Sequence, residues 1–208
     1  MRKILICLAL ALLPCSAARA ELIMIQLGSS VQDLAIDNVI SGSIIRQGLT
    51  ITFTANTGKL NATAGSYGID ADGADNSAQL DGASGVNELI AISFDKAVEF
   101  TQLTLGAYSS GEVGNLTLGL NAPFALPPTN PALDVYNFSS SDLPLGNFLA
   151  VGQAATISYV SGNGFSLEGI HVKTVPEPAT LGLSAVAMAC LTLRRRQRGL
   201  HLQCGLQT

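Results

Sequence analysis

Apolar and polar residues alternate with a period of two along several short runs between residues 21 and 174. The clearest runs are LTITFTA at residues 49–55 and ELIAISF at residues 88–94. Such alternation is typical of β-strands that bury one face. We expect further strands at residues 98–108, 115–120, 134–138, 155–160 and 165–172. No run in this region carries the 3.6-residue apolar stripe of an amphipathic helix.

Three local features modify this strand pattern. The apolar parity changes between Phe100 and Leu103, which predicts a β-bulge or a crossing onto another sheet. Gly169 interrupts the last run and predicts a second bulge, which leaves His171 pointing outward. Residues 121–131 hold four prolines and predict a loop or an edge segment. Many short strands separated by turn residues predict an all-β domain, an antiparallel β-sandwich or jelly roll.

The first 20 residues have the three parts of a secretory signal peptide. Arg2 and Lys3 precede an apolar core, and small residues lead to a predicted cleavage site between Ala20 and Glu21. A lipoprotein, lipidated at Cys15, is the alternative, but Pro14 occupies the position where a small residue is normally needed. A core helix of a cytosolic protein fits the ordered basic, apolar and cleavage parts less well.

The C-terminal residues 175–199 differ from everything before them, and residues 200–208 follow as a short tail. A Pro-Glu-Pro triplet, Pro176, Glu177 and Pro178, precedes an apolar run at residues 179–193. As a helix this run would be roughly 22 Å long, which is short against a hydrocarbon core of about 30 Å. The basic cluster behind it would stay cytoplasmic and place the preceding domain outside. A C-terminal core helix of the domain is the alternative.

Setting aside the first 20 residues and everything after Pro178 changes the charge and cysteine content of what remains. All fifteen acidic residues lie between Glu21 and Glu177, where the four bases are Arg46, Lys59, Lys96 and Lys173, so this part has a formal charge of −11. Such a domain repels nucleic acid and anionic lipid surfaces. It contains no cysteine, which excludes an internal disulfide and a thiolate metal site.

Acidic residues gather in one Gly-rich stretch ahead of the strand at residues 88–94. Clustered carboxylates on a flexible backbone suit a hard cation such as calcium. The spacing does not satisfy an EF-hand, because Ala74 holds its fifth position. The alternative is a solvated acidic loop. The candidate calcium ligands are Asp70, Asp72, Asp75, Asp81 and Glu88.

Catalysis finds little support in the residues. His171 is the only histidine of the exported part, so any Ser-His-Asp arrangement would have to use it. Paired carboxylates, as in glycosidases, remain open because acids are plentiful. We therefore expect no enzyme. Tryptophan is absent, which leaves the tyrosines as candidate sugar-stacking residues: Tyr67, Tyr108, Tyr136 and Tyr159.

The order of parts at the C-terminus resembles the PEP-CTERM sorting signal of exported bacterial proteins. The match is Val175-Pro176-Glu177-Pro178-Ala179-Thr180, then the apolar run, then Arg194, Arg195 and Arg196. The resemblance implies recognition by exosortase, a membrane-embedded protease/transpeptidase, after transient anchoring in the inner membrane. It also implies a cell-surface or extracellular location in a bacterium that makes exopolysaccharide and biofilm.

The strand pattern of the domain is itself similar to galactose-binding-like jelly rolls. Two roles are therefore compatible with the sequence: a structural or adhesive protein of an exopolysaccharide matrix, and a carbohydrate-binding module, either with or without calcium. A secreted hydrolase is the third.

Overall fold

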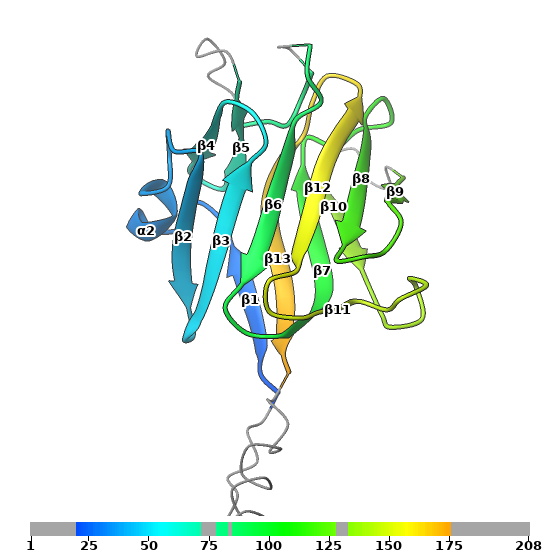
Figure 1. The fold of residues 1–208 in the computed structure, drawn as a ribbon. Helices are drawn as coiled ribbons and strands as arrows, with labels where there is room; N and C mark the ends of the chain where they lie inside the picture. The colour runs from blue at the N-terminus through cyan, green and yellow to red at the C-terminus, as the bar shows by residue number, and fades with distance from the viewer. Residues whose placement is uncertain (1–19, 72–77, 83–84, 128–132, 176–208) are drawn as a thin grey trace, which may run out of the picture. The chain divides into compact units, whose positions relative to one another are not determined.

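The computed structural model describes residues 20–71, 78–82, 85–127 and 133–175 (Figure 1). Apart from one helical turn, every element of these residues is a β-strand, and the strands form two antiparallel sheets. Residues 20–175 make up one compact unit. The predicted signal peptide, the apolar run at residues 179–193 and the tail lie outside the described residues.

The first sheet has the order β10-β7-β13-β5-β4, and two further strands pair with β13 and β7 outside this order. β1 pairs with β13 and β11 pairs with β7, both antiparallel. The last strand, β13, therefore lies at the centre of this sheet. The strands of the first sheet are β1 (Leu22–Gln26), β4 (Lys59–Thr63), β5 (Ser66–Asp70), β7 (Val98–Gly106), β10 (Leu133–Asn137), β11 (Phe148–Leu149) and β13 (Ser166–Thr174).

The second sheet has the order β2-β3-β6-β12-β8-β9. Its edge strand β9 lies between Pro123 and Pro127 of the proline-rich segment, and prolines, which lack an N–H donor, are tolerated beside a sheet edge but not in a central strand. This confirms the predicted edge for the described part of that segment. The strands are β2 (Ser41–Arg46), β3 (Leu49–Ala55), β6 (Leu89–Phe94), β8 (Val113–Leu118), β9 (Phe124–Leu126) and β12 (Ala154–Ser161).

The core lies between the two sheets, which Figure 1 shows as two layers. Along β3 the burial alternates residue by residue, so that Leu49, Ile51 and Phe53 point inward. The ring of Phe53 meets Tyr67 of the other sheet edge-to-face, with 5.1 Å between centroids. Burying such apolar faces contributes about 25 cal/mol per Å² of surface, which is what holds the layers together. The fold is β-sandwich-like, as predicted, and the jelly-roll classification stays a prediction.

Both predicted irregularities are bulges within the pairing of β7 and β13. Phe100 pairs with Val172 and Gln102 with His171, so Thr101 is the extra residue between them. Its hydroxyl donates to the carbonyl oxygen of His171 (3.1 Å). The second extra residue is Glu168, one position before the predicted Gly169. Each bulge restores the alternation of buried residues that the sequence had broken.

Several elements were not expected from the sequence. β1, β2, β4, β5 and β11 were missed because their apolar alternation is short, and β2 buries only Ile44. The helical turn α2 (Val31–Leu34) is too short to carry a periodic stripe. Among the described residues no helix has the length and apolar character needed to cross a membrane.

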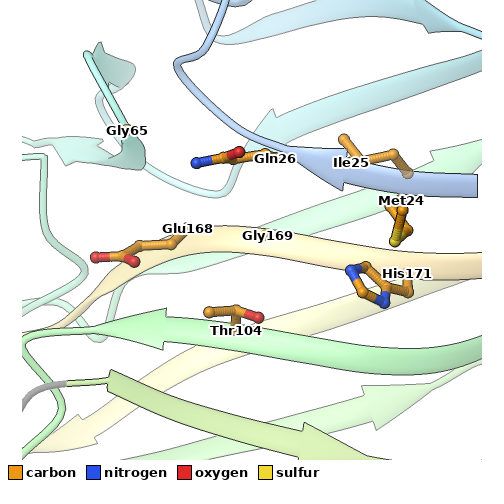
Figure 2. Close-up of a pocket in the computed structure, with 8 residues that line it drawn as sticks. All are labelled: Met24, Ile25, Gln26, Gly65, Thr104, Glu168, Gly169 and His171. Carbon is orange, nitrogen blue, oxygen red and sulfur yellow. The ribbon is translucent and has the colours of Figure 1, made fainter.

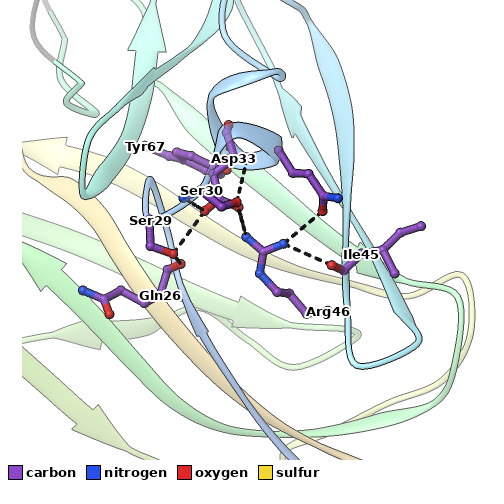
Figure 3. A network of polar contacts seen from close by, with 8 residues as sticks. Gln26, Ser29, Ser30, Asp33, Ile45, Arg46 and Tyr67 are labelled. Atoms are coloured by element: carbon purple, nitrogen blue, oxygen red, sulfur yellow. Dashed lines mark hydrogen bonds and ion pairs between the residues drawn. The ribbon is translucent and has the colours of Figure 1, made fainter.

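A polar network fixes α2 in the connection between β1 and β2 (Figure 3). Ser30 and Asp33 form a capping box, in which each side chain accepts from the other's backbone N–H. Asp33 is fully buried and forms an ion pair with Arg46 at the end of β2. Arg46 also donates to the Ser30 hydroxyl (3.0 Å), and the Tyr67 hydroxyl donates to the carbonyl oxygen of Asp33 (2.9 Å). The connection is thereby tied to strands of both sheets.

Candidate functional site

The two ends of the described domain are joined by hydrogen bonds. The backbone N–H of Glu21 donates to Oγ1 of Thr174 (3.0 Å), and the N–H of Thr174 donates to the Glu21 carbonyl oxygen (2.9 Å). The N–H of Val175 donates to the carbonyl oxygen of Ala97 (2.9 Å). Ala20 and Glu21, the residues of the predicted signal cleavage, are exposed. The two predicted processing regions therefore start from neighbouring strand ends.

A groove of about 480 Å³ opens on the outer face of the first sheet, over β1, β13 and β7 (Figure 2). The strand register explains its shape. Gly169 on β13 pairs with Gln26 of β1 on one side and with Thr104 of β7 on the other. A position without a side chain thus lies between two polar side chains. Figure 2 shows Glu168 at one end of this hollow and His171 at the other.

Two glycines give the groove its form. At Gly169 an added Cβ would lie 3.1 Å from the Ile25 carbonyl oxygen, with Thr104 as its next neighbour. Because Gly169 has no side chain, the groove is deeper at this position. At Gly106 an added Cβ would lie 1.8 Å from Oε1 of Glu168. The Glu168 carboxylate therefore occupies space that any other residue at position 106 would fill. The bulge at Glu168 is what turns this side chain onto the outer face.

Four polar side chains lie around the groove. Within the described part of the chain, the side chains of Gln26, Thr104, Glu168 and His171 form no hydrogen bond or ion pair. Desolvation by burial raises the pKa of Glu168 and lowers the pKa of His171. Both shifts disfavour the charged form, as expected for groups that lose water without gaining a protein partner.

The predicted acidic residues are only partly within the described structure, since Asp72 and Asp75 lie outside it. Asp70 ends β5 opposite Lys59 and is not in a loop. Glu88 is 1% exposed, and its carboxylate accepts from the backbone N–H of Asp81 (2.8 Å). Among the described residues no three acidic, histidine or cysteine side chains gather as a metal site. The calcium site stays a prediction.

Three of the four candidate sugar-stacking tyrosines lie in the core. Tyr67 and Tyr108 are fully buried and Tyr136 is 8% exposed. Each donates its hydroxyl to a backbone carbonyl, those of Asp33, Leu126 and Pro127. Tyr159 is half-buried and donates to the carbonyl oxygen of Gly162 (2.8 Å). The buried rings stabilise the core and offer no face to a sugar.

Sequence reasoning identified His171 as outward-facing but missed Gln26, Thr104 and Glu168. The only local signal was the glycine after Glu168, because a Gly in a strand often marks a bulge or a close approach. The other partners come from β1 and β7, whose register against β13 no local pattern gives.

The sorting residues Pro176, Glu177, Pro178, Arg194, Arg195 and Arg196 lie outside the described residues. The family model of the PEP-CTERM protein-sorting motif matches residues 174–196, which begin at the last residue of β13. No curated protein and no solved structure matches the chain. The chain is thus similar to PEP-CTERM sorting-signal proteins: it carries their sorting motif, which marks it as an exported protein processed through exosortase.

Proposed function

We propose that the chain is a structural or adhesive protein of the cell surface or of an exopolysaccharide matrix. The observation that carries this proposal is the continuity of the sorting motif with β13, since the match begins at Thr174. What is sorted is therefore the β-sandwich-like domain itself, with no spacer before the motif. A folded, strongly acidic domain delivered in this way serves best as a durable surface component. On this proposal the chain is not an enzyme.

In this proposal the apolar run at residues 179–193 holds the precursor transiently in the inner membrane. Exosortase then acts at the motif around Glu177, and the domain is released to the outside. Signal cleavage before Glu21 leaves β1 as the first element of the mature chain.

The test is cell fractionation in the native host, with mass spectrometry of the exported protein. We expect the mature chain to start at Glu21 and to lack peptides from the arginine cluster. The Glu177→Ala variant should accumulate as membrane-bound precursor, whereas Glu168→Ala, outside the motif, should be processed normally. Recovery of intact 194–208 peptides from surface protein would contradict processing. Mature protein found only in the periplasm would contradict the surface role.

The second candidate is a carbohydrate-binding module, which the polar groove over Gly169 favours. Calcium dependence of this module is open to a direct test by thermal unfolding of the full chain. At a calcium concentration a hundredfold above the dissociation constant, binding would stabilise the fold by about 2.7 kcal/mol. Magnesium is the control, because its stricter octahedral geometry suits an irregular set of carboxylate ligands less well. Identical thermal unfolding curves in calcium and in chelator would contradict a calcium site.

A further inference from the structure

We propose that the groove over Gly169 binds one neutral, polyhydroxylated sugar unit, held by Gln26, Thr104, Glu168 and His171. The inference deepens the proposed function, since it names the ligand class through which the exported domain would adhere. It depends on the described residues of β1, β7 and β13 alone.

The first support is the hydrogen-bonding capacity of the groove. Gln26 offers an amide oxygen and an NH₂ group, and Thr104 offers a hydroxyl that both donates and accepts. The Glu168 carboxylate accepts, and the His171 ring does both when neutral. None of these groups bonds to another described residue through its side chain. A ligand with several hydroxyl groups, each a donor and an acceptor, matches this mixed set best.

The second support is the size and shape of the site. Small-molecule sites have volumes of roughly 300–1,000 Å³, and this groove has about 480 Å³. Met24 lines it beside His171 and is 67% exposed. Its flexible apolar side chain can pack against the C–H face of a sugar ring, as its unbranched thioether adapts to irregular surfaces. The polar groups then contact the hydroxyls on the ring's edges.

The third support is charge, which selects a neutral ligand. Among the described residues that line the groove, Glu168 is the only one with a carboxylate, and none is a lysine or an arginine. The exported part carries a formal charge of −11. A uronic acid or a sulfated sugar would be repelled by the Glu168 carboxylate and by the net charge of the domain, and would find no fully charged basic partner in the groove once it leaves water.

The fourth support is that the position of Glu168 depends on a bulge and a glycine. The bulge presents the carboxylate outward, and Gly106 beneath it leaves the space that the carboxylate occupies. Bulges often re-aim a side chain next to a functional site. The burial that raises the pKa of Glu168 shows that this position is unfavourable for a charge without a ligand.

The test is glycan-array binding by the full chain, followed by titration of the best neutral ligand. The array carries neutral oligosaccharides, their methyl monosaccharide units and glucuronic acid-containing counterparts. We expect selective binding of neutral glycans. Binding of the monosaccharides alone would identify a free sugar, and binding of the oligosaccharides would identify a polymer.

Two variants connect such binding to the groove. Glu168→Gln should weaken it at least tenfold, since a charged acceptor becomes a neutral one. Gly106→Ala keeps the charge but displaces the carboxylate, and should weaken binding similarly. Glu99→Gln makes the same chemical change on the same strand pair, outside the groove, and should change affinity less than twofold. Thermal unfolding of each variant confirms that the fold is retained.

No binding of any neutral glycan by the wild-type chain would overturn the proposal, as would equal binding by the wild type and both groove variants. Neither result contradicts the proposed structural or adhesive function if the chain is still processed and delivered to the surface. If a chain that never leaves the periplasm still binds sugar through the groove, the result would support the sugar site and contradict the matrix role.

Discussion

Two polar clusters lie on either side of the end of β1, and they differ in how their groups are satisfied. In the network around Asp33, the carboxylate pairs with the guanidinium of Arg46 and accepts from the backbone N–H of Ser30, and Arg46 also donates to the Ser30 hydroxyl (Figure 3). In the groove over Gly169, the polar side chains form no such bonds within the described chain (Figure 2). A polar cluster that satisfies itself stabilises the fold, whereas one that does not is available to a ligand.

The largest expected effect is on the stability of the self-satisfied network. Asp33→Ala removes a buried ion-pair partner and the capping box, and leaves Arg46, whose side chain is 20% exposed, without its carboxylate. Breaking a buried pair costs about 3–5 kcal/mol. For a domain of this size that lowers Tm by about 6–20 °C. Thermal unfolding followed by circular dichroism measures it.

The double variant Asp33→Ala with Arg46→Ala is the control for that effect. Because the two groups act on each other, its loss of stability should be smaller than the sum of the single losses. Additive losses would show that the two side chains are energetically independent, and the contrast with the groove would weaken.

The Tyr67 hydroxyl tests one hydrogen bond of the same network. Tyr67→Phe keeps the ring that packs on Phe53 and removes the donor to the Asp33 carbonyl. We expect a loss of about 1 kcal/mol in the free energy of unfolding, measured by urea denaturation. Tyr159 is half-buried, and Tyr159→Phe removes a comparable but solvent-exposed bond to the carbonyl oxygen of Gly162, so it should cost less. Equal losses would contradict the importance of burial.

The strands with strong alternation could be predicted from sequence, and so could the bulges, because both are local consequences of which face is buried. The run at residues 49–55 coincides with β3, and the parity change after Phe100 locates the bulge at Thr101. The network and the groove could not be predicted, because both depend on register. Arg46 meets Asp33 across a connection, and Gly169 meets Gln26 and Thr104 across two strand pairs.

Replacing the carboxylate of the groove should stabilise the fold at neutral pH, whereas replacing the carboxylate of the network should destabilise it. Glu168 has a raised pKa in the folded state, so its favourable contribution is complete below its ordinary pKa near 4.5 and is lost as pH rises through the raised value. Glu168→Gln should therefore gain stability over the wild type as pH increases above about 4.5. Thermal unfolding between pH 4 and 8 measures the difference. A variant that becomes less stable than the wild type with rising pH would show that Glu168 has a structural role.

The smallest effect is expected for an exposed ion pair outside both clusters. Glu99 and Lys173 pair at 3.4 Å on β7 and β13, with side chains 40% and 46% exposed. Exposed pairs contribute about 0–1 kcal/mol, so Glu99→Ala should change Tm by no more than a few degrees. A larger loss would mean that simple proximity of charges, rather than burial, sets the stability of this sheet.

The most direct measurement is a chemical-shift map of the full chain titrated with the neutral sugar that binds best on the array. We expect shifts in the backbone amides of Gln26, Thr104 and residues 168–171, with the network around Asp33 undisturbed. Shifts that are absent from these residues, or that centre on Tyr159 or on the acidic stretch near Asp81, would contradict a sugar site over Gly169.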